Sequence, residues 1–262
     1  ILAVDLDGDG DVELVTKGTR LYTSPTIAMM SKQFYFWENT DGQGTFGPPQ
    51  SISSERLEGK VFAADIDGDG SMDLIHTHDM GENGKIIWFK NDGQANFVRH
   101  SVSDTNTAFG VFAADIDGDG DIDIATASHY NNTIAWYENT DGLGTFGSQK
   151  VIRTTADNTE ILFDVSEPRV SIFGADVDGD GDIDLATTSK NGGTIAWYEN
   201  TDGQGTFGPQ QVVATSATDG QDMYAADIDG DGDIDLASAS YTDDNIAWYE
   251  NTDGQGTFGP QQ

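Results

Sequence analysis

Short apolar runs, separated by Gly, Asn and Asp, recur along the whole chain. In one copy of the pattern the runs are VFAAD (111–115), IDIATAS (122–128), NTIAWYEN (132–139) and TFGSQKVI (145–152). They are rich in β-branched and aromatic residues, as strands are. No segment keeps the 3.6-residue apolar period of an amphipathic helix. The pattern therefore predicts an all-β chain with four short strands in each copy and few helices.

One repeat accounts for the whole pattern. An acidic string begins at residues 5, 65, 115, 176 and 227, so the spacings are 60, 50, 61 and 51 residues. Four of the five tryptophans of the chain occur at one position of the repeat, in segments such as IAWYENTDGLGTFG, and the fifth, Trp37, lies one residue later. Four antiparallel strands per repeat form the blade of a β-propeller. We expect a single domain over residues 1–262, with repeats at approximately 1–57, 58–107, 108–168, 169–219 and 220–262.

The acidic string has the spacing of a calcium loop. In the third copy, positions 1, 3 and 5 are Asp115, Asp117 and Asp119. Gly120 at position 6 permits the sharp turn, position 7 offers its backbone carbonyl, and Asp123 at position 9 closes the shell. Calcium takes six to eight hard oxygen ligands in a flexible geometry, whereas magnesium demands stricter octahedral geometry. Zinc prefers nitrogen and sulfur ligands.

We therefore expect one calcium ion per repeat, about five in all. The predicted ligands are Asp5, Asp7, Asp9, Asp11 and Glu13; Asp65, Asp67, Asp69, Ser71 and Asp73; Asp115, Asp117, Asp119, Asp121 and Asp123; Asp176, Asp178, Asp180, Asp182 and Asp184; and Asp227, Asp229, Asp231, Asp233 and Asp235. Two loops depart from the pattern. Glu13 is a longer acid at position 9, and Ser71 at position 7 is expected to contribute only its carbonyl.

Two other interpretations of the loop are weaker. An EF-hand needs a bidentate Glu at position 12 between two helices, but position 12 holds Thr, His or Ser and the flanks are strand-like. A metal-free Asp-Gly turn is the simpler alternative. Clustering four or five carboxylates without a cation is costly, however, and the cluster occurs five times. The repetition favours a metal site.

The overall charge changes the interpretation of the composition. A net charge of −34 with 36% hydrophobic residues suggests disorder, but 24 of the 46 acidic residues fall in the five loops. Divalent cations there would remove much of the self-repulsion.

So acidic a chain is a poor partner for nucleic acid and for anionic membranes. No cysteine and no apolar run of about 18 residues is present. The first residues, ILAVD, already look like a strand, so we expect a mature or trimmed piece.

With its DxDGDGxxD loops in a four-stranded repeat, the chain resembles the FG-GAP/VCBS repeat proteins, which include integrin α-subunit propellers and many secreted microbial proteins. The resemblance covers essentially the whole chain. It implies a propeller with calcium in the hairpin between strands 1 and 2 of each blade, and ligands such as Asp65, Asp67, Asp69 and Asp73. Family propellers commonly close with six to eight blades. The five repeats imply either a small five-bladed ring or part of a larger one.

The alternation of strand direction predicts two unlike faces. The 1–2 loops and 3–4 turns share one face and barely vary, whereas the 2–3 and 4–1 connections on the other face vary most, at 17–33 and 154–170. Binding residues favour variable loops on a rigid scaffold. We expect a protein or glycan partner on the variable face. The candidate contacts are Arg20, Tyr22, His129, Tyr130, Arg153, Arg169 and Tyr241.

No catalytic constellation is visible in the sequence. There is no Cys and no GxSxG, and the aspartates repeat identically in every blade. We expect His76 and His78, which flank Thr77, to be ordinary polar residues at the surface rather than ligands of a metal ion. The leading prediction is a non-catalytic, extracellular, calcium-stabilised scaffold for adhesion or assembly, within a larger extracellular assembly. A carbohydrate-binding lectin is the alternative prediction, and a polysaccharide lyase is the third. Extracellular placement follows from millimolar calcium supply, and a sequon at Asn131 agrees with it.

Overall fold

The chain folds entirely into antiparallel sheets in the part described by the computed structural model. That part comprises residues 1–23, 28–53, 59–78, 85–103, 108–128, 133–154, 170–188, 193–215, 220–240 and 244–262. It contains no helix, and so no helix that would be long and apolar enough to cross a membrane. The prediction of an all-β propeller built from four-stranded blades is confirmed.

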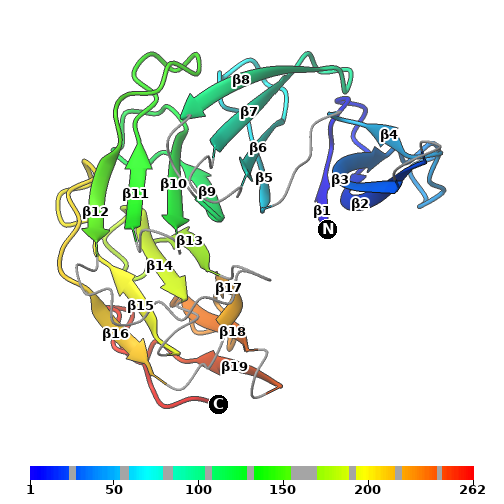
Figure 1. The fold of residues 1–262 in the computed structure, drawn as a ribbon. Coiled ribbons are helices and arrows are strands. Elements are labelled where there is room, and N and C mark those ends of the chain that lie inside the picture. The colour runs from blue at the N-terminus through cyan, green and yellow to red at the C-terminus, as the bar shows by residue number, and fades with distance from the viewer. Residues whose placement is uncertain are drawn as a thin grey trace. The chain divides into compact units, whose positions relative to one another are not determined.

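Each repeat forms one blade, with strands hydrogen-bonded in chain order (Figure 1). The first blade is β1 (Leu2–Val4), β2 (Glu13–Thr23), β3 (Ala28–Trp37) and β4 (Gln50–Ser51). The second is β5 (Val61–Ala64), β6 (Asp73–His78), β7 (Lys85–Asn91) and β8 (Phe97–Ser103). The third is β9 (Gly110–Ala114), β10 (Asp123–Ser128), β11 (Thr133–Tyr137) and β12 (Lys150–Thr154).

The last two blades repeat this order. The fourth is β13 (Ser171–Ala175), β14 (Asp184–Thr188), β15 (Ile195–Tyr198) and β16 (Gln211–Ala214). The fifth is β17 (Gly220–Ala226), β18 (Asp235–Ser240) and β19 (Asn245–Tyr249). At the outer edge of β19, Gln262 and Trp248 exchange two backbone hydrogen bonds of 3.0 and 3.2 Å, so Gln262 lies where the other blades have their fourth strand.

The blades belong to two compact units, residues 1–108 and 109–262. In the first unit, Leu6, Phe36, Leu74 and Phe89 belong to one buried cluster drawn from both blades. In the second unit, Trp197 of the fourth blade packs in a cluster with Leu236 and Tyr249 of the fifth. Apolar burial between successive blades therefore holds each unit together, because a single blade cannot bury both of its faces.

The fourth strand of the third blade begins later than the sequence predicts. Residues 145–152 were expected to form it, but β12 covers Lys150–Thr154. Phe146 makes only an isolated bridge to Asn139, and the Gly147 N–H donates to the carbonyl of Glu138 at 2.8 Å. The TFG segment therefore completes a tight turn before the strand starts, and apolar Phe146 belongs to that turn.

Candidate metal centres in the five acidic loops

Each acidic loop joins the first two strands of its blade and folds around its first aspartate. The position-1 carboxylate accepts the N–H of the position-6 glycine at 2.9–3.1 Å in all five loops. That glycine has a φ of 90–103° in every copy, a left-handed conformation that glycine adopts without steric cost. Position 5 closes the second half of the turn, where its Oδ1 accepts the N–H of position 7 at 2.8–2.9 Å.

The position-9 acid is the buried anchor of the loop. Asp184, for example, is fully buried, and its Oδ2 accepts the N–H of Val177 at position 2, 3.0 Å away. Its Oδ1 accepts the N–H of Asn200, at the end of the third strand, at 2.8 Å. The same pair of bonds recurs in every blade, and Glu13 makes it in the first. Glu13 therefore reaches the same two backbone N–H groups as the aspartates of the other loops, as we predicted from the sequence.

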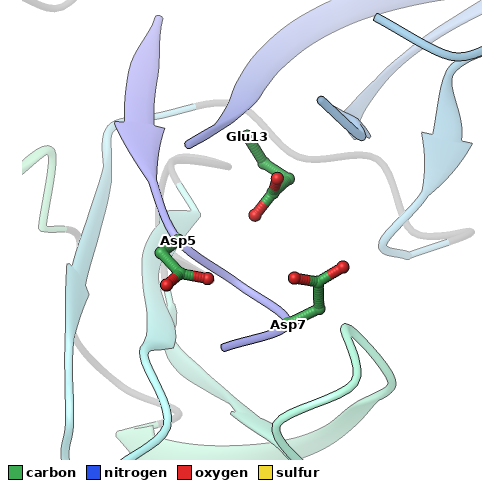
Figure 2. Close-up of side chains that lie close together, drawn as sticks. All are labelled: Asp5, Asp7 and Glu13. Atoms are coloured by element: carbon green, nitrogen blue, oxygen red, sulfur yellow. The ribbon is translucent and has the colours of Figure 1, made fainter. Parts of the chain in front are cut away.

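Positions 1, 3 and 9 converge in every loop. One oxygen from each of the three carboxylates lies within 4.8 Å of the other two, and Figure 2 shows Asp5, Asp7 and Glu13 directed into one common space. Within the described residues these five triads are the groups of three or more acidic, His or Cys side chains with such spacing. Several of their buried oxygens have no hydrogen-bond donor: Oδ1 of Asp67, Asp115, Asp117 and Asp178.

This donor set fits a hard divalent cation. All converging atoms are carboxylate oxygens, which calcium prefers, and a buried carboxylate oxygen without a donor is costly unless a cation neutralises it. The side chains at positions 5 and 7 are not part of the triads. The position-7 aspartates instead lie against the first glycine of the 3–4 turn, as Asp182 does at Gly203. Within each blade the acidic loop and the 3–4 turn thus share one face.

Burial shifts the titration of the anchor acids. It raises the pKa of Asp123 and of Asp184 to about 7, although hydrogen bonds from Asn139 and Asn200 oppose the rise. The pKa of Glu13 and of Asp73 is also raised, again mainly by burial. Neighbouring carboxylates add to the rise, since Asp117 and Asp119 both repel the charge on Asp123. A cation in the triad would reverse this balance by favouring the charged form.

Every blade has an asparagine at or just after the end of its third strand, and in three blades it contacts the acidic loop of the preceding blade. This residue was missed in the sequence analysis. These hairpin asparagines are Asn39, Asn91, Asn139, Asn200 and Asn251. Within the first unit, Asn91 donates from Nδ2 to the carbonyl of Leu6, in the preceding blade's acidic loop, at 2.6 Å. Within the second, Asn200 and Asn251 donate likewise to Ile116 and Val177 at 2.8 Å. The signal was an Asn at one fixed position of every repeat.

The predicted partner residues are only partly described. Residues 17–33 were expected to form a connection, but most of them belong to β2 and β3, which pair as far as Thr23 and Ala28. Arg20 and Tyr22 therefore lie on β2, and Arg153 lies on β12. Arg153 donates from Nη1 to the Tyr198 hydroxyl at 3.0 Å, so it links the third and fourth blades. His129, Tyr130, Arg169 and Tyr241 lie outside the described residues, as does the sequon at Asn131.

The expectation that His76 is a surface residue is wrong. His76 is fully buried on β6, its Nδ1 lies 3.0 Å from the carbonyl of Lys60, and its ring meets Phe34 edge-on at 4.8 Å. Strand alternation placed it correctly on one face of the blade. That face is covered by a neighbouring blade, which the pattern of one strand does not reveal.

Comparison with known proteins identifies the repeat and the fold. Residues 78–126 and 176–238 match the family model of the FG-GAP-like repeat. No curated protein matches. An Agrocybe aegerita lectin that recognises non-reducing terminal N-acetylglucosamine is similar in fold, with a TM-score of 0.60 and 21% identity; the match covers 94% of this chain and 65% of the lectin. The NanB sialidase from Streptococcus pneumoniae is also similar, with a TM-score of 0.50 and 10% identity over 91% and 41% of the respective chains.

Proposed function

We propose that this chain, whose residues 78–126 and 176–238 match the FG-GAP-like repeat and whose strands form propeller blades, is a calcium-stabilised, non-catalytic recognition module that works outside the cell in adhesion or assembly. The observation that carries the proposal is the convergence of three carboxylates in each of five loops. In each loop, positions 1, 3 and 9 would hold the ion, with the position-5 carboxylate and the position-7 carbonyl completing the shell. Calcium would supply the positively charged neighbour that stabilises the ionised form of buried acids such as Asp123 and Asp184.

The ion would stabilise more than its own loop. The position-9 acid binds the backbone of the hairpin asparagine, and that asparagine binds the preceding blade's loop. A cation that fixes Asp184 therefore also fixes Asn200 and, through it, Ile116 of the third blade. Calcium would therefore also stabilise the packing of successive blades within each unit.

Metal content and thermal melting test this role together. We expect the protein, after equilibrium dialysis against millimolar calcium, to contain more calcium by elemental analysis than the dialysis buffer does, and to melt at a markedly higher temperature in excess calcium than in chelator. A ligand at 100 times its Kd adds about 2.7 kcal/mol per site, so several sites together give a large shift. Coincident melting curves with no bound metal would refute the proposal. Magnesium in place of calcium is the control, and we expect it to restore little of the stability.

An extracellular location follows from the same chemistry. Extracellular calcium modules typically have a Kd of about 10⁻⁴–10⁻³ M, and cytosolic calcium would leave such sites empty. Titration with calcium in a competing-chelator assay measures this directly. Affinities in the range of 10⁻⁸ M would argue instead for a cytosolic calcium buffer.

The partner would dock on the variable face, away from the acidic loops. The reason is physical: the loop face repeats one acidic structure five times, whereas the variable connections carry aromatic and basic residues of differing sequence. Shortening the β2–β3 hairpin so that it lacks Tyr22, and replacing the connections that contain Tyr130 and Tyr241 by short Gly-Asn turns, should abolish binding while calcium content stays unchanged. Undiminished affinity in such a variant would move the partner site elsewhere.

A lectin is the second candidate function, and the fold likeness to the N-acetylglucosamine-specific lectin favours it. A glycan array probed with and without chelator separates the two candidates. Sugar-dependent binding lost in chelator supports the lectin, whereas binding only to proteins supports adhesion or assembly. Sialoside and uronate-polysaccharide substrates serve as enzyme controls, and we expect neither sialic acid release nor the ultraviolet absorbance of an unsaturated uronate.

A further inference from the structure

The second acidic loop differs from the other four at the residue directly before the hairpin asparagine. Four blades have a glutamate there: Glu38, Glu138, Glu199 and Glu250. The second blade has Lys90. Its ammonium group contacts the carboxylate of Asp67 at position 3 and lies 3.0 Å from Oδ2 of Asp69 at position 5. The lysine side chain is 35% exposed and that of Asp67 only 6%, so the ion pair is partly buried.

In three of the other blades the glutamate contacts a residue of the outer edge instead. Glu138 pairs with Lys150 at 2.5 Å, and Glu38 accepts a hydrogen bond from Gln50 at 3.2 Å. The third of these contacts is from Gln262 to Glu250 at 3.1 Å. In the second blade the equivalent residue of the outer strand is His100, opposite Trp88 on β7; its ring lies 4.6 Å from that of Trp88, and it offers Lys90 no carboxylate. The lysine therefore has its acidic partners in the loop.

The surroundings of the second loop are also less acidic. The first loop has five acids of its own, and Glu38 and Asp41 lie in the adjoining hairpin. The second has four acids, because Ser71 replaces the position-7 aspartate, and its hairpin contributes Asp92 and the positive Lys90. Affinity for calcium in such loops depends on the number and charge of the ligands. Ser71 and Lys90 each make the second loop less negative than the others, so both lower its attraction for a divalent ion.

We propose that Lys90 is the built-in cation of the second loop, so that this loop keeps its fold without a divalent ion and binds calcium much more weakly than the other four. The inference rests on the proposed calcium role. The lysine neutralises Asp67 and Asp69, whereas the other loops depend on a bound ion for the same purpose. The protein would thus hold four tightly bound ions and one weak site, with a metal-independent blade in the first unit.

Native mass spectrometry on the whole chain, titrated with calcium, tests the proposal by counting ions. We expect four ions to saturate together in the wild type, and a fifth to bind at least about tenfold more weakly, as one nearby unit charge can cause. Lys90→Glu, which restores the residue of the other blades, should bring the fifth ion into the tight class. The matched control Glu199→Lys, in the fourth blade, should reduce the tight class to three.

The outcomes separate this inference from the calcium role itself. Five equivalent ions in the wild type, unchanged in Lys90→Glu, would overturn the role of Lys90 and leave the calcium role intact. No bound ion in any variant would overturn both. If Lys90→Glu does not fold, Lys90→Gln removes the charge alone and should still strengthen the fifth site. Melting in chelator gives a second readout: Lys90→Glu should be less stable than the wild type there, and equally stable in excess calcium.

Discussion

At the scale of single residues, the position-9 acid decides whether a loop keeps its shape. Asp184 is fully buried and accepts two backbone N–H groups. Asp184→Asn keeps the shape but turns an NH₂ group toward one of these donors. We expect it to lower the free energy of unfolding by about 2–4 kcal/mol even in chelator, because a buried N–H loses its acceptor. In calcium the loss should be larger, since a ligand is also removed. Urea denaturation in both conditions measures the two effects.

Asp182→Asn, in the same loop, is the matched control. Its side chain lies against the 3–4 turn rather than in the triad, so we expect a change within about 0.5 kcal/mol, as at ordinary surface sites. Equal effects of the two substitutions would mean that the number of charges, and not their position, determines the stability of the loop.

The raised pKa of Asp123 and of Asp184 predicts opposite pH dependences with and without calcium. Burial raises each pKa from 3.8 to about 7. The native metal-free protein therefore binds more protons than the unfolded chain between these values, and its stability should fall as the pH rises from 5 to 8. Calcium needs the ionised carboxylate, so stability in excess calcium should rise over the same range. Melting temperatures across this range, with chelator and with calcium, provide the measurement. Parallel pH profiles in the two conditions would contradict the prediction.

Residue spacing alone predicted the acidic loops but not the environment of individual side chains. The three carboxylates occupy fixed positions in one short string, so the convergence of Asp115, Asp117 and Asp123 needed no tertiary information. The contact of Lys90 with Asp67 depends on how the acidic loop lies beside β7 of the same blade. The burial of His76 depends on which surface of its blade faces another blade. A single repeat does not contain that information.

At the scale of elements, the 3–4 turn of one blade packs against the tryptophan of the preceding blade. A Cβ on Gly205, in the fourth blade's turn, would lie 2.2 Å from Cζ2 of Trp136 in the third. Gly205→Ala should therefore destabilise the protein by about 2–3 kcal/mol beyond any backbone strain, because the close-packed blade interface cannot relax fully. Chemical denaturation monitored by tryptophan fluorescence measures the loss.

Gly181→Ala supplies the comparison that isolates packing from strain. Gly181 also has a positive φ, of 97°, but a Cβ there would meet nothing within 4 Å. It should cost only the left-handed backbone penalty of about 1–2 kcal/mol. If both variants lose the same stability, the contact with Trp136 contributes little to the interface.

Strands were predicted better than the turns that join them. The first three strands of the third blade lie where the apolar runs are, but β12 starts at Lys150 because the apolar Phe146 belongs to a turn. The hairpin asparagines show the same difficulty. Their role is to join two blades, as Asn200 joins the fourth blade to Ile116, and repetition at one position was the only trace of it in the sequence.

At the scale of the whole molecule, charge and apolar burial oppose each other. The chain carries a net charge of −34, and such self-repulsion destabilises a compact state. The acidic residues are concentrated in the loops, whereas the buried clusters within each unit are apolar. The five loops hold 24 of the 46 acidic residues, so about half of the acidic charge lies at sites where a small number of divalent ions can neutralise it. This arrangement explains how a chain with so few hydrophobic residues folds into stacked sheets.

Salt should consequently stabilise the metal-free protein far more than the calcium-loaded one. Raising the ionic strength from 0.05 to 0.5 M shortens the screening length from about 14 to about 4 Å, which weakens repulsion between carboxylates of one loop. We expect the melting temperature in chelator to rise by several degrees, since 1 kcal/mol corresponds to about 2–4 °C for a chain of this size. Choline chloride, whose cation is too large to enter the triads, should act as well as sodium chloride if screening is the cause. Stabilisation by sodium alone would mean that a monovalent ion occupies the sites, and an unchanged melting temperature in both salts would show that loop repulsion does not limit the stability of the blades.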